Sequence, residues 1–101
     1  MTNPTSTIKP SQWPQSIDEV NRVLDQVLTA KQRKAICSLP LSELRTLDST
    51  LGAVIRNEFG LLAGNDELIT CTLEIDAVLA ARTLVREYWD HLNSISDKYI
   101  Q

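Results

Sequence analysis

The chain has 101 residues, of which 43% are hydrophobic and 23% charged, and its net charge is −3. A chain of this length forms one domain, and this composition is typical of a soluble globular protein. The longest apolar runs are only a few residues, far short of the roughly 20 needed to cross a bilayer. The first nine residues lack an apolar segment behind a basic start, so we expect no secretory signal, no membrane contact and a cytoplasmic protein.

Charge is divided unevenly along the chain. Residues 1–56 carry 7 basic and 5 acidic side chains, whereas residues 57–101 carry 3 and 8, a net charge of −5 for the second half. An acidic surface repels the phosphates of nucleic acids and attracts basic protein surfaces. This pattern favours a protein partner over nucleic acid, although it is also typical of a surface that only keeps a protein soluble.

The N-terminal residues predict a flexible tail over 1–14, followed by a helical domain over 15–97 and a short C-terminal tail over 98–101. Three of the four prolines lie in the first fourteen residues, among Thr, Ser and Asn. Such a stretch is extended and poorly ordered. Trp13 is the exception, because a large aromatic residue just before a helix packs against the core.

Two capping signals predict the first two helices. Ser16 and Glu19 form a capping box that begins a helix, and Thr29 with Gln32 repeats the signal and begins a shorter helix through about Ser38. Apolar residues at helical spacing are expected to face the core: Ile17, Val20, Leu24, Val27, Leu28, Ala35, Ile36 and Leu39. The polar residues Asn21, Arg22, Asp25 and Gln26 are expected to face water, and Lys31, Arg33 and Lys34 to form a basic outer face.

A third, central helix is predicted from Leu41 to Phe59. Pro40 breaks the chain before it, and one apolar stripe that is expected to face the core then runs over nearly five turns. Its residues are Leu41, Leu44, Leu47, Leu51, Val54, Ile55 and Phe59. Gly52 within this helix costs roughly 1 kcal/mol relative to alanine, so we expect another helix to approach closely there.

The corner after this helix contains the densest polar group of the chain. Gly60 and Gly64 stand where positive φ is expected, and Asn65 is a good residue to begin a helix. Arg56 is expected to bond the last free carbonyls of the central helix, and Asn57 to bond the backbone of the loop. We interpret these five residues as architectural, with partner contact as the alternative.

The remaining sequence predicts a short helix from Asn65 through about Cys71 and a long one over roughly 75–96. The long helix has a broad apolar side. No segment alternates at period two and no hairpin turn is evident. The fold class is therefore predicted to be all-α, a compact single-domain bundle of about five helices with non-parallel crossings. The apolar side of the predicted long helix comprises Val78, Leu79, Ala81, Leu84, Val85, Tyr88, Trp89, Leu92 and Ile95.

The dozen residues around Arg56 are the most specific motif. They include Leu51-Gly52, then 55–61, then Gly64-Asn65, and a Trp-x-x-Leu follows at Trp89 and Leu92. This arrangement resembles a bacterial family of small helical domains of unknown function, with the pattern LG-x-x-IRN-x-FGLW-x-GN. The chain departs from it at Asp48, where the family tends to have His, and at Leu62, where it has Trp. The resemblance covers roughly residues 15–95 and implies an all-helical fold, but no activity.

Little in the sequence indicates catalysis. The single histidine, His91, lies four residues after Glu87 on the last predicted helix, but no serine or cysteine accompanies it as a nucleophile. One histidine and two distant cysteines, Cys37 and Cys71, do not supply a zinc site, and the acidic residues lack the spacing of a calcium loop. We therefore expect no enzyme, metal or cofactor, and two reduced, buried cysteines.

These features favour a non-enzymatic protein-binding module, of the kind that an immunity protein or inhibitor uses to neutralise a bacterial toxin with a basic surface. The alternative is a small regulatory or adaptor protein that dimerises through the last helix and contacts nucleic acid through Lys31, Arg33 and Lys34. The sequence leaves the oligomeric state open. The residues expected to bind a protein partner are Glu67, Glu74, Asp76, Glu87 and Asp90.

Overall fold

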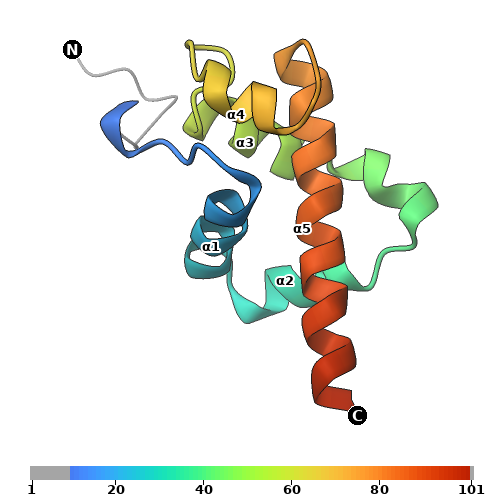
Figure 1. The fold of residues 1–101 in the computed structure, drawn as a ribbon. Coiled ribbons are helices and arrows are strands. Elements are labelled where there is room, and N and C mark those ends of the chain that lie inside the picture. Colours follow the sequence, from blue (N-terminus) through green and yellow to red (C-terminus); the bar gives the residue numbers. More distant parts are fainter. Residues whose placement is uncertain (1–9, 101) are drawn as a thin grey trace.

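All the larger helical elements pack on one long helix, α5 (Figure 1). The computed structural model describes the backbone of residues 10–100 and the side chains of residues 11–94. Within this range the chain is all-α, as predicted, and has no strand. Its radius of gyration, 13.5 Å, is close to the value of about 13 Å for a compact domain of this length. The elements in chain order are η1 (Pro10–Gln12), α1 (Ile17–Val27), α2 (Ala30–Cys37), η2 (Leu41–Leu47), α3 (Leu51–Glu58), α4 (Asp66–Cys71) and α5 (Ala77–Ile100).

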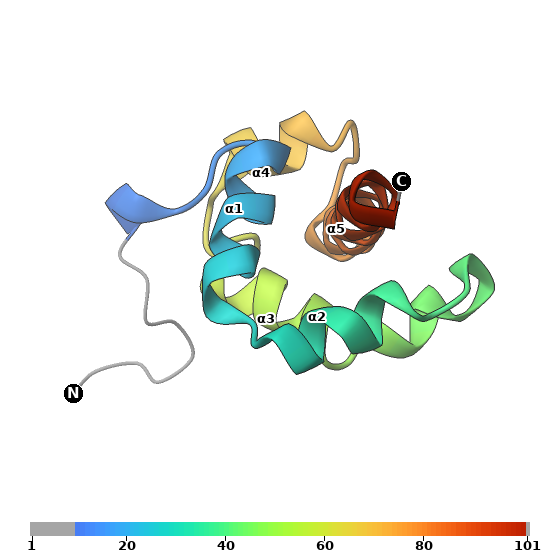
Figure 2. The same ribbon diagram turned by 90° about the horizontal axis from the view of Figure 1, so that it is seen from below.

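The shorter helices cross α5 instead of running alongside it. In Figure 2, α5 is seen end-on, whereas α1 and α2 are seen from the side. The predicted non-parallel bundle is therefore confirmed. This arrangement lets several short apolar faces cover successive turns of one long helix.

The caps of α1 and α2 form where the sequence predicts them. The Glu19 amide donates to the Ser16 hydroxyl at 3.2 Å, although the Glu19 carboxylate accepts from the amide of Gln15 and not from that of Ser16. The capping box of α2 is complete, with Thr29 and Gln32 bonded to each other's backbone at 2.8 and 3.1 Å. Each cap satisfies amides that the first turn of a helix leaves free.

The predicted central helix is wrong in one respect, because it is divided into η2 and α3. Residues 48–50 form turns, and Thr50 donates its hydroxyl to the carbonyl of Leu47. Asp, Ser and Thr compete for backbone bonds in this way and end helices. Gly52 also has a different neighbour from the one expected, since an added Cβ would lie 3.3 Å from the Leu47 carbonyl oxygen at the end of η2.

α5 is anchored at its start and is longer than predicted. Asp76 accepts from the Leu79 amide at 2.9 Å and so caps the first turn. Trp89 donates its indole N–H to the Leu39 carbonyl at 2.8 Å, which joins α5 to the residues after α2. The helix runs to Ile100, beyond the predicted end near residue 96 and into the predicted tail over 98–101, whose last residue lies outside the description.

The core lies between α5 and the crossing helices. Its fully buried side chains include Leu24, Ile55, Leu68, Leu84 and Tyr88. Some apolar residues assigned to the core are instead exposed, and Asn21, expected to face water, is 9% exposed. The Ile95 side chain lies outside the described residues. The exposed apolar exceptions are Val27, Ala35, Leu41, Val54, Val78 and Leu79.

Candidate functional site

The glycine-rich corner after α3 holds the N-terminal segment. Gly60 and Gly64 have φ of +76° and +108°, as predicted for a turn that only glycine adopts readily. The Trp13 ring lies so close to Gly60 that an added Cβ would overlap it, which confirms that Trp13 packs against the domain. Asn65 donates from one buried amide to the carbonyls of Pro14 and Phe59, at 2.8 and 2.7 Å.

These contacts correct two details of the predicted corner. Asn65 occupies the N-cap position just before α4 but makes no capping bond with its side chain, because its amide donates to the two carbonyls instead. Pro14 is buried beside Trp13, so the packed part of the chain begins before the predicted boundary at residue 15. Residues 1–9 of the predicted tail lie outside the description.

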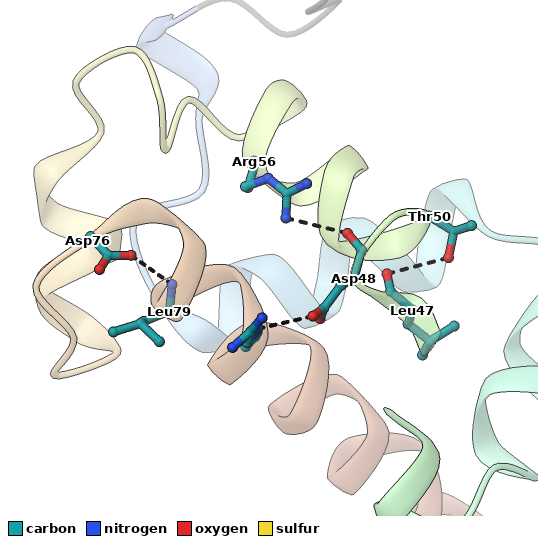
Figure 3. A network of polar contacts seen from close by, with 7 residues as sticks. Leu47, Asp48, Thr50, Arg56, Asp76 and Leu79 are labelled. Carbon is teal, nitrogen blue, oxygen red and sulfur yellow. Dashed lines mark hydrogen bonds and ion pairs between the residues drawn. The ribbon is translucent and has the colours of Figure 1, made fainter. Parts of the chain in front are cut away.

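Arg56 and Asn57 have different surroundings from those predicted. Arg56 points back toward η2, where its guanidinium donates to the Asp48 carbonyl at 3.4 Å, and it does not bond the end of α3 (Figure 3). The Asp48 carboxylate binds Arg82 of α5 at 3.0 Å. Asn57 is exposed and makes no side-chain hydrogen bond within the described part of the chain. Arg56 thus stabilises the η2–α3 turn, whereas Asn57 is free for a partner.

A cluster of Asp25, Tyr88 and His91 joins α1 to α5. Asp25 accepts from the Tyr88 hydroxyl at 2.9 Å with one carboxylate oxygen and contacts His91 Nε2 at 2.8 Å with the other. Because a carboxylate only accepts, His91 carries its proton on Nε2. The Tyr88 and His91 rings are stacked with centroids 5.8 Å apart. The carboxylate beside His91 is therefore Asp25 from α1, not Glu87 on the same helix.

The surroundings of this cluster favour a structural role. A hollow of about 180 Å³ beside His91 is lined by Asp18, Asn21, Arg22 and Asp25, and contains no serine or cysteine that His91 could activate. The Tyr88 hydroxyl is fully buried and already donates to Asp25. The Asn21 Oδ1 is buried without a hydrogen-bond partner among the described residues. The cluster resembles the Asp–His pairs of enzymes, but what it does in this geometry is hold α1 against α5.

The Tyr88 environment predicts a pH-dependent stability. Burial, with the hydrogen bond to Asp25 as a smaller cause, raises the pKa of Tyr88 above its ordinary value of about 10. The folded state therefore holds this proton more tightly than the unfolded state does. The resulting stability is complete below about pH 10 and is lost as the pH rises toward the raised pKa. We expect the urea midpoint to fall more steeply above about pH 10 in the wild type than in Tyr88→Phe; parallel curves would contradict this.

The predicted basic face of α2 is smaller than expected. Arg33 donates to the carbonyls of Asp25 and Leu28 at 2.9 and 2.6 Å, so it satisfies the C-terminal end of α1. Lys31 and Lys34 remain exposed. Two lysines make a weak electrostatic site for a phosphate backbone.

The five acidic residues predicted to bind a partner lie in two places. Glu67 on α4 and Asp76 before α5 are exposed. Glu74, also before α5, is half-buried and accepts from the Thr83 hydroxyl at 3.3 Å. Glu87 and Asp90 lie about three and four turns further along α5. The first three therefore lie on α4 or in the segment that leads from it into α5, and the other two lie apart.

An apolar patch beside the first three acidic residues was missed by sequence reasoning. Leu73 and Ile75 are each 91% exposed, and Val78 and Leu79 are 46% and 37% exposed. We call these four residues the loop patch. Leu73 also has φ of +63°, a left-handed conformation that is unfavourable for leucine. The alternation of apolar and acidic residues over 73–76 is visible in the sequence, but only the structure shows that the apolar ones are uncovered.

Neither cysteine forms a disulfide, and only Cys37 is partly buried. Cys71 is exposed, contrary to expectation, and its Sγ donates to the Gln15 carbonyl at 3.1 Å. Among the residues that the structure describes, no three His, Cys, Asp or Glu side chains form a metal-binding group. None of the described helices has the length and apolar character needed to span a membrane.

Comparison with protein-family models, curated proteins and solved structures finds no match to this chain. The family resemblance around Arg56 therefore stays a prediction. The loop patch with Glu67, Glu74 and Asp76 is the candidate functional site that the geometry itself singles out.

Proposed function

We propose that the chain is a non-enzymatic protein-binding module that binds a basic protein through the loop patch and its acidic neighbours. The observation that carries the proposal is the near-complete exposure of Leu73 and Ile75 between carboxylates. Large apolar groups clustered on a surface mark interaction sites, and apolar contacts surrounded by charges are typical of protein interfaces. The acidic residues would speed encounter with a basic partner and select it.

The backbone at Leu73 adds support. A leucine in the left-handed region costs about 1–2 kcal/mol, and this side chain makes few contacts that offset the cost, because it is 91% exposed. Strain of this kind is a reason to suspect function. An inhibitor that neutralises a toxin is the class of protein that we propose, because a small acidic module needs no catalytic group for that task.

A capture experiment tests the function. The full chain, immobilised at micromolar concentration, is expected to retain a basic protein from an extract of its source cells, and salt is expected to weaken the retention. The double variant Leu73→Asp/Ile75→Asp is expected to lose the protein, whereas Leu62→Asp, at another exposed leucine (65%), is expected to keep it. Co-expression should then restore growth to cells that produce the captured protein. Retention of no protein, or equal retention by the double variant, would count against the proposal.

Relief of the strain at residue 73 should be measurable separately. We expect Leu73→Asn to raise the free energy of unfolding by about 0.5–1 kcal/mol, because asparagine tolerates positive φ better than leucine. Leu73→Ala keeps the unfavourable φ and should leave the stability nearly unchanged. Urea unfolding followed by circular dichroism gives both values. If function maintains the strained leucine, Leu73→Asn gains stability but loses the partner; equal stability of the two variants would argue against strain.

A further inference from the structure

Further along α5 lies a hollow whose chemistry is complementary to the loop patch. The arginine hollow, as we call it, has a volume of about 170 Å³. Its apolar lining comes from Leu41 and Leu44 of η2 and from Val85 of α5, and the basic groups around it are Arg45, Arg82 and Arg86. Its size suits one large aliphatic side chain with an acidic neighbour.

The charges of the hollow are largely unpaired. Asp48 is its single acidic residue and binds Arg82 at 3.0 Å. Arg45 and Arg86 are exposed and have no ion-pair or hydrogen-bond partner within residues 11–94. Arg82 and Arg86 are also two of the three basic residues in the acidic second half of the chain. The arginine hollow therefore concentrates positive charge in a chain of net charge −3, and this charge favours binding of an acidic group.

The segment Leu73-Glu74-Ile75-Asp76 has the matching chemistry. It alternates exposed aliphatic side chains with carboxylates. The bond from Thr83 to Glu74 and the cap that Asp76 provides to α5 hold both carboxylates over the first turns of α5. These bonds fix the segment in place while the Leu73 and Ile75 side chains stay exposed. The segment can therefore insert into a hollow on another molecule.

The two features border one uncovered face of α5, the loop patch at its first turn and the arginine hollow about two turns further along. In Figure 2, η2 (green) lies on one side of α5, and the segment that leads from α4 into α5 (orange) lies on the other. Val78, Arg82, Arg86 and Asp90 are all exposed at four-residue spacing, which traces the uncovered face along α5. A two-fold axis through this face places the loop patch of each copy over the arginine hollow of the other, and such an interface closes after two copies.

From this complementarity we infer that the free chain forms an antiparallel dimer through α5, with Leu73–Asp76 of each copy seated in the arginine hollow of its partner. The dimer buries both loop patches and pairs carboxylates with Arg45 and Arg86. It occupies the surface that the proposed function assigns to a protein partner, so the two interactions exclude each other. A monomer that still captures a basic protein would overturn the dimer alone, and a dimer that captures nothing would overturn the proposed function alone.

Sedimentation equilibrium of the full chain tests the dimer. Reducing conditions are used so that the exposed Cys71 does not cross-link two copies. The wild type is expected to have the mass of a dimer and to dissociate with added salt. Leu73→Asp and Arg86→Glu are each expected to raise the dimer dissociation constant at least tenfold. The matched controls Leu62→Asp and Arg22→Glu, at exposed sites on other elements, should remain dimeric.

A charge exchange separates a direct contact from an indirect effect. Glu74→Arg with Arg86→Glu in one chain restores opposite charges across the interface, so the double variant is expected to recover the dimer that Arg86→Glu alone loses. Circular dichroism checks that each variant is folded. A wild type that is monomeric at every concentration would overturn the inference. So would a dimer that survives either Leu73→Asp or Arg86→Glu, or an exchange that fails to restore association.

Discussion

Gly60→Ala should reduce the free energy of unfolding by about 3 kcal/mol. Part of this loss comes from the φ of +76°, which costs an alanine about 1–2 kcal/mol. The rest comes from overlap with Trp13, because the added Cβ would lie only 2.6 Å from Cζ2 of the indole ring. Overpacking of this kind costs about 1–3 kcal/mol. Urea unfolding followed by circular dichroism measures the total.

A double-mutant cycle separates the two contributions. In a Trp13→Ala background the ring is absent, so Gly60→Ala is expected to cost only the conformational part, about 1–2 kcal/mol. An equal cost in both backgrounds would show that Trp13 does not rest on Gly60. Such a result would also remove the reason for placing the start of the packed domain at Trp13.

The second large effect is expected for Asp25→Ala, at about 2–4 kcal/mol of lost stability. Asp25 accepts from the Tyr88 hydroxyl and from His91, at 2.9 and 2.8 Å. Tyr88 is fully buried, so its hydroxyl would be left without a partner and away from water. A buried donor without a partner costs about 1–3 kcal/mol, and hydrogen bonds to a charged group add about 1.5–3 kcal/mol. Thermal and urea unfolding give the value.

Tyr88→Phe provides the matched control for Asp25→Ala. In the wild type it removes a satisfied hydroxyl, with an expected cost of about 1–1.5 kcal/mol. In the Asp25→Ala background it removes an unsatisfied one and should be neutral or stabilising. The same cost in both backgrounds would mean that the Tyr88 hydroxyl does not depend on Asp25 for its partner.

The helices could be predicted because their signals are local. Capping residues such as Ser16 and Thr29, together with apolar periodicity, depend only on neighbours in the chain. The positive φ at Gly60 and Gly64 was predictable for the same reason. These signals suffice for the all-α fold class.

The sequence contains a signal for the division of the central helix. Leu41, Leu44 and Leu47 are three residues apart, as in a 3₁₀ helix, whereas Leu51, Ile55 and Phe59 are four apart, as in an α-helix. The change of spacing falls at Asp48-Ser49-Thr50, where side chains compete for backbone bonds. A single helix from Leu41 to Phe59 ignores this change of spacing, which is why that prediction is wrong.

The candidate sites were not predictable in the same way, because they depend on which helices meet. Asp25 faces Tyr88 and His91, which lie 63 and 66 residues later, and no local pattern specifies that contact. Val78 and Leu79 have the spacing of core residues, but none of the described helices covers the first turn of α5 on that side. Leu73 and Ile75 became a candidate surface only when the fold showed that no described residue covers them.

The position of α5 in the chain order has a consequence for how the molecule is made. Every extensive contact between elements includes α5, and all the other elements precede it. While a ribosome synthesises the chain from its N-terminus, α1 to α4 are completed before the helix that covers their apolar faces. Folding of these helices must therefore wait until α5 has been synthesised, and nascent chains halted before Ala77 should be bound by chaperones.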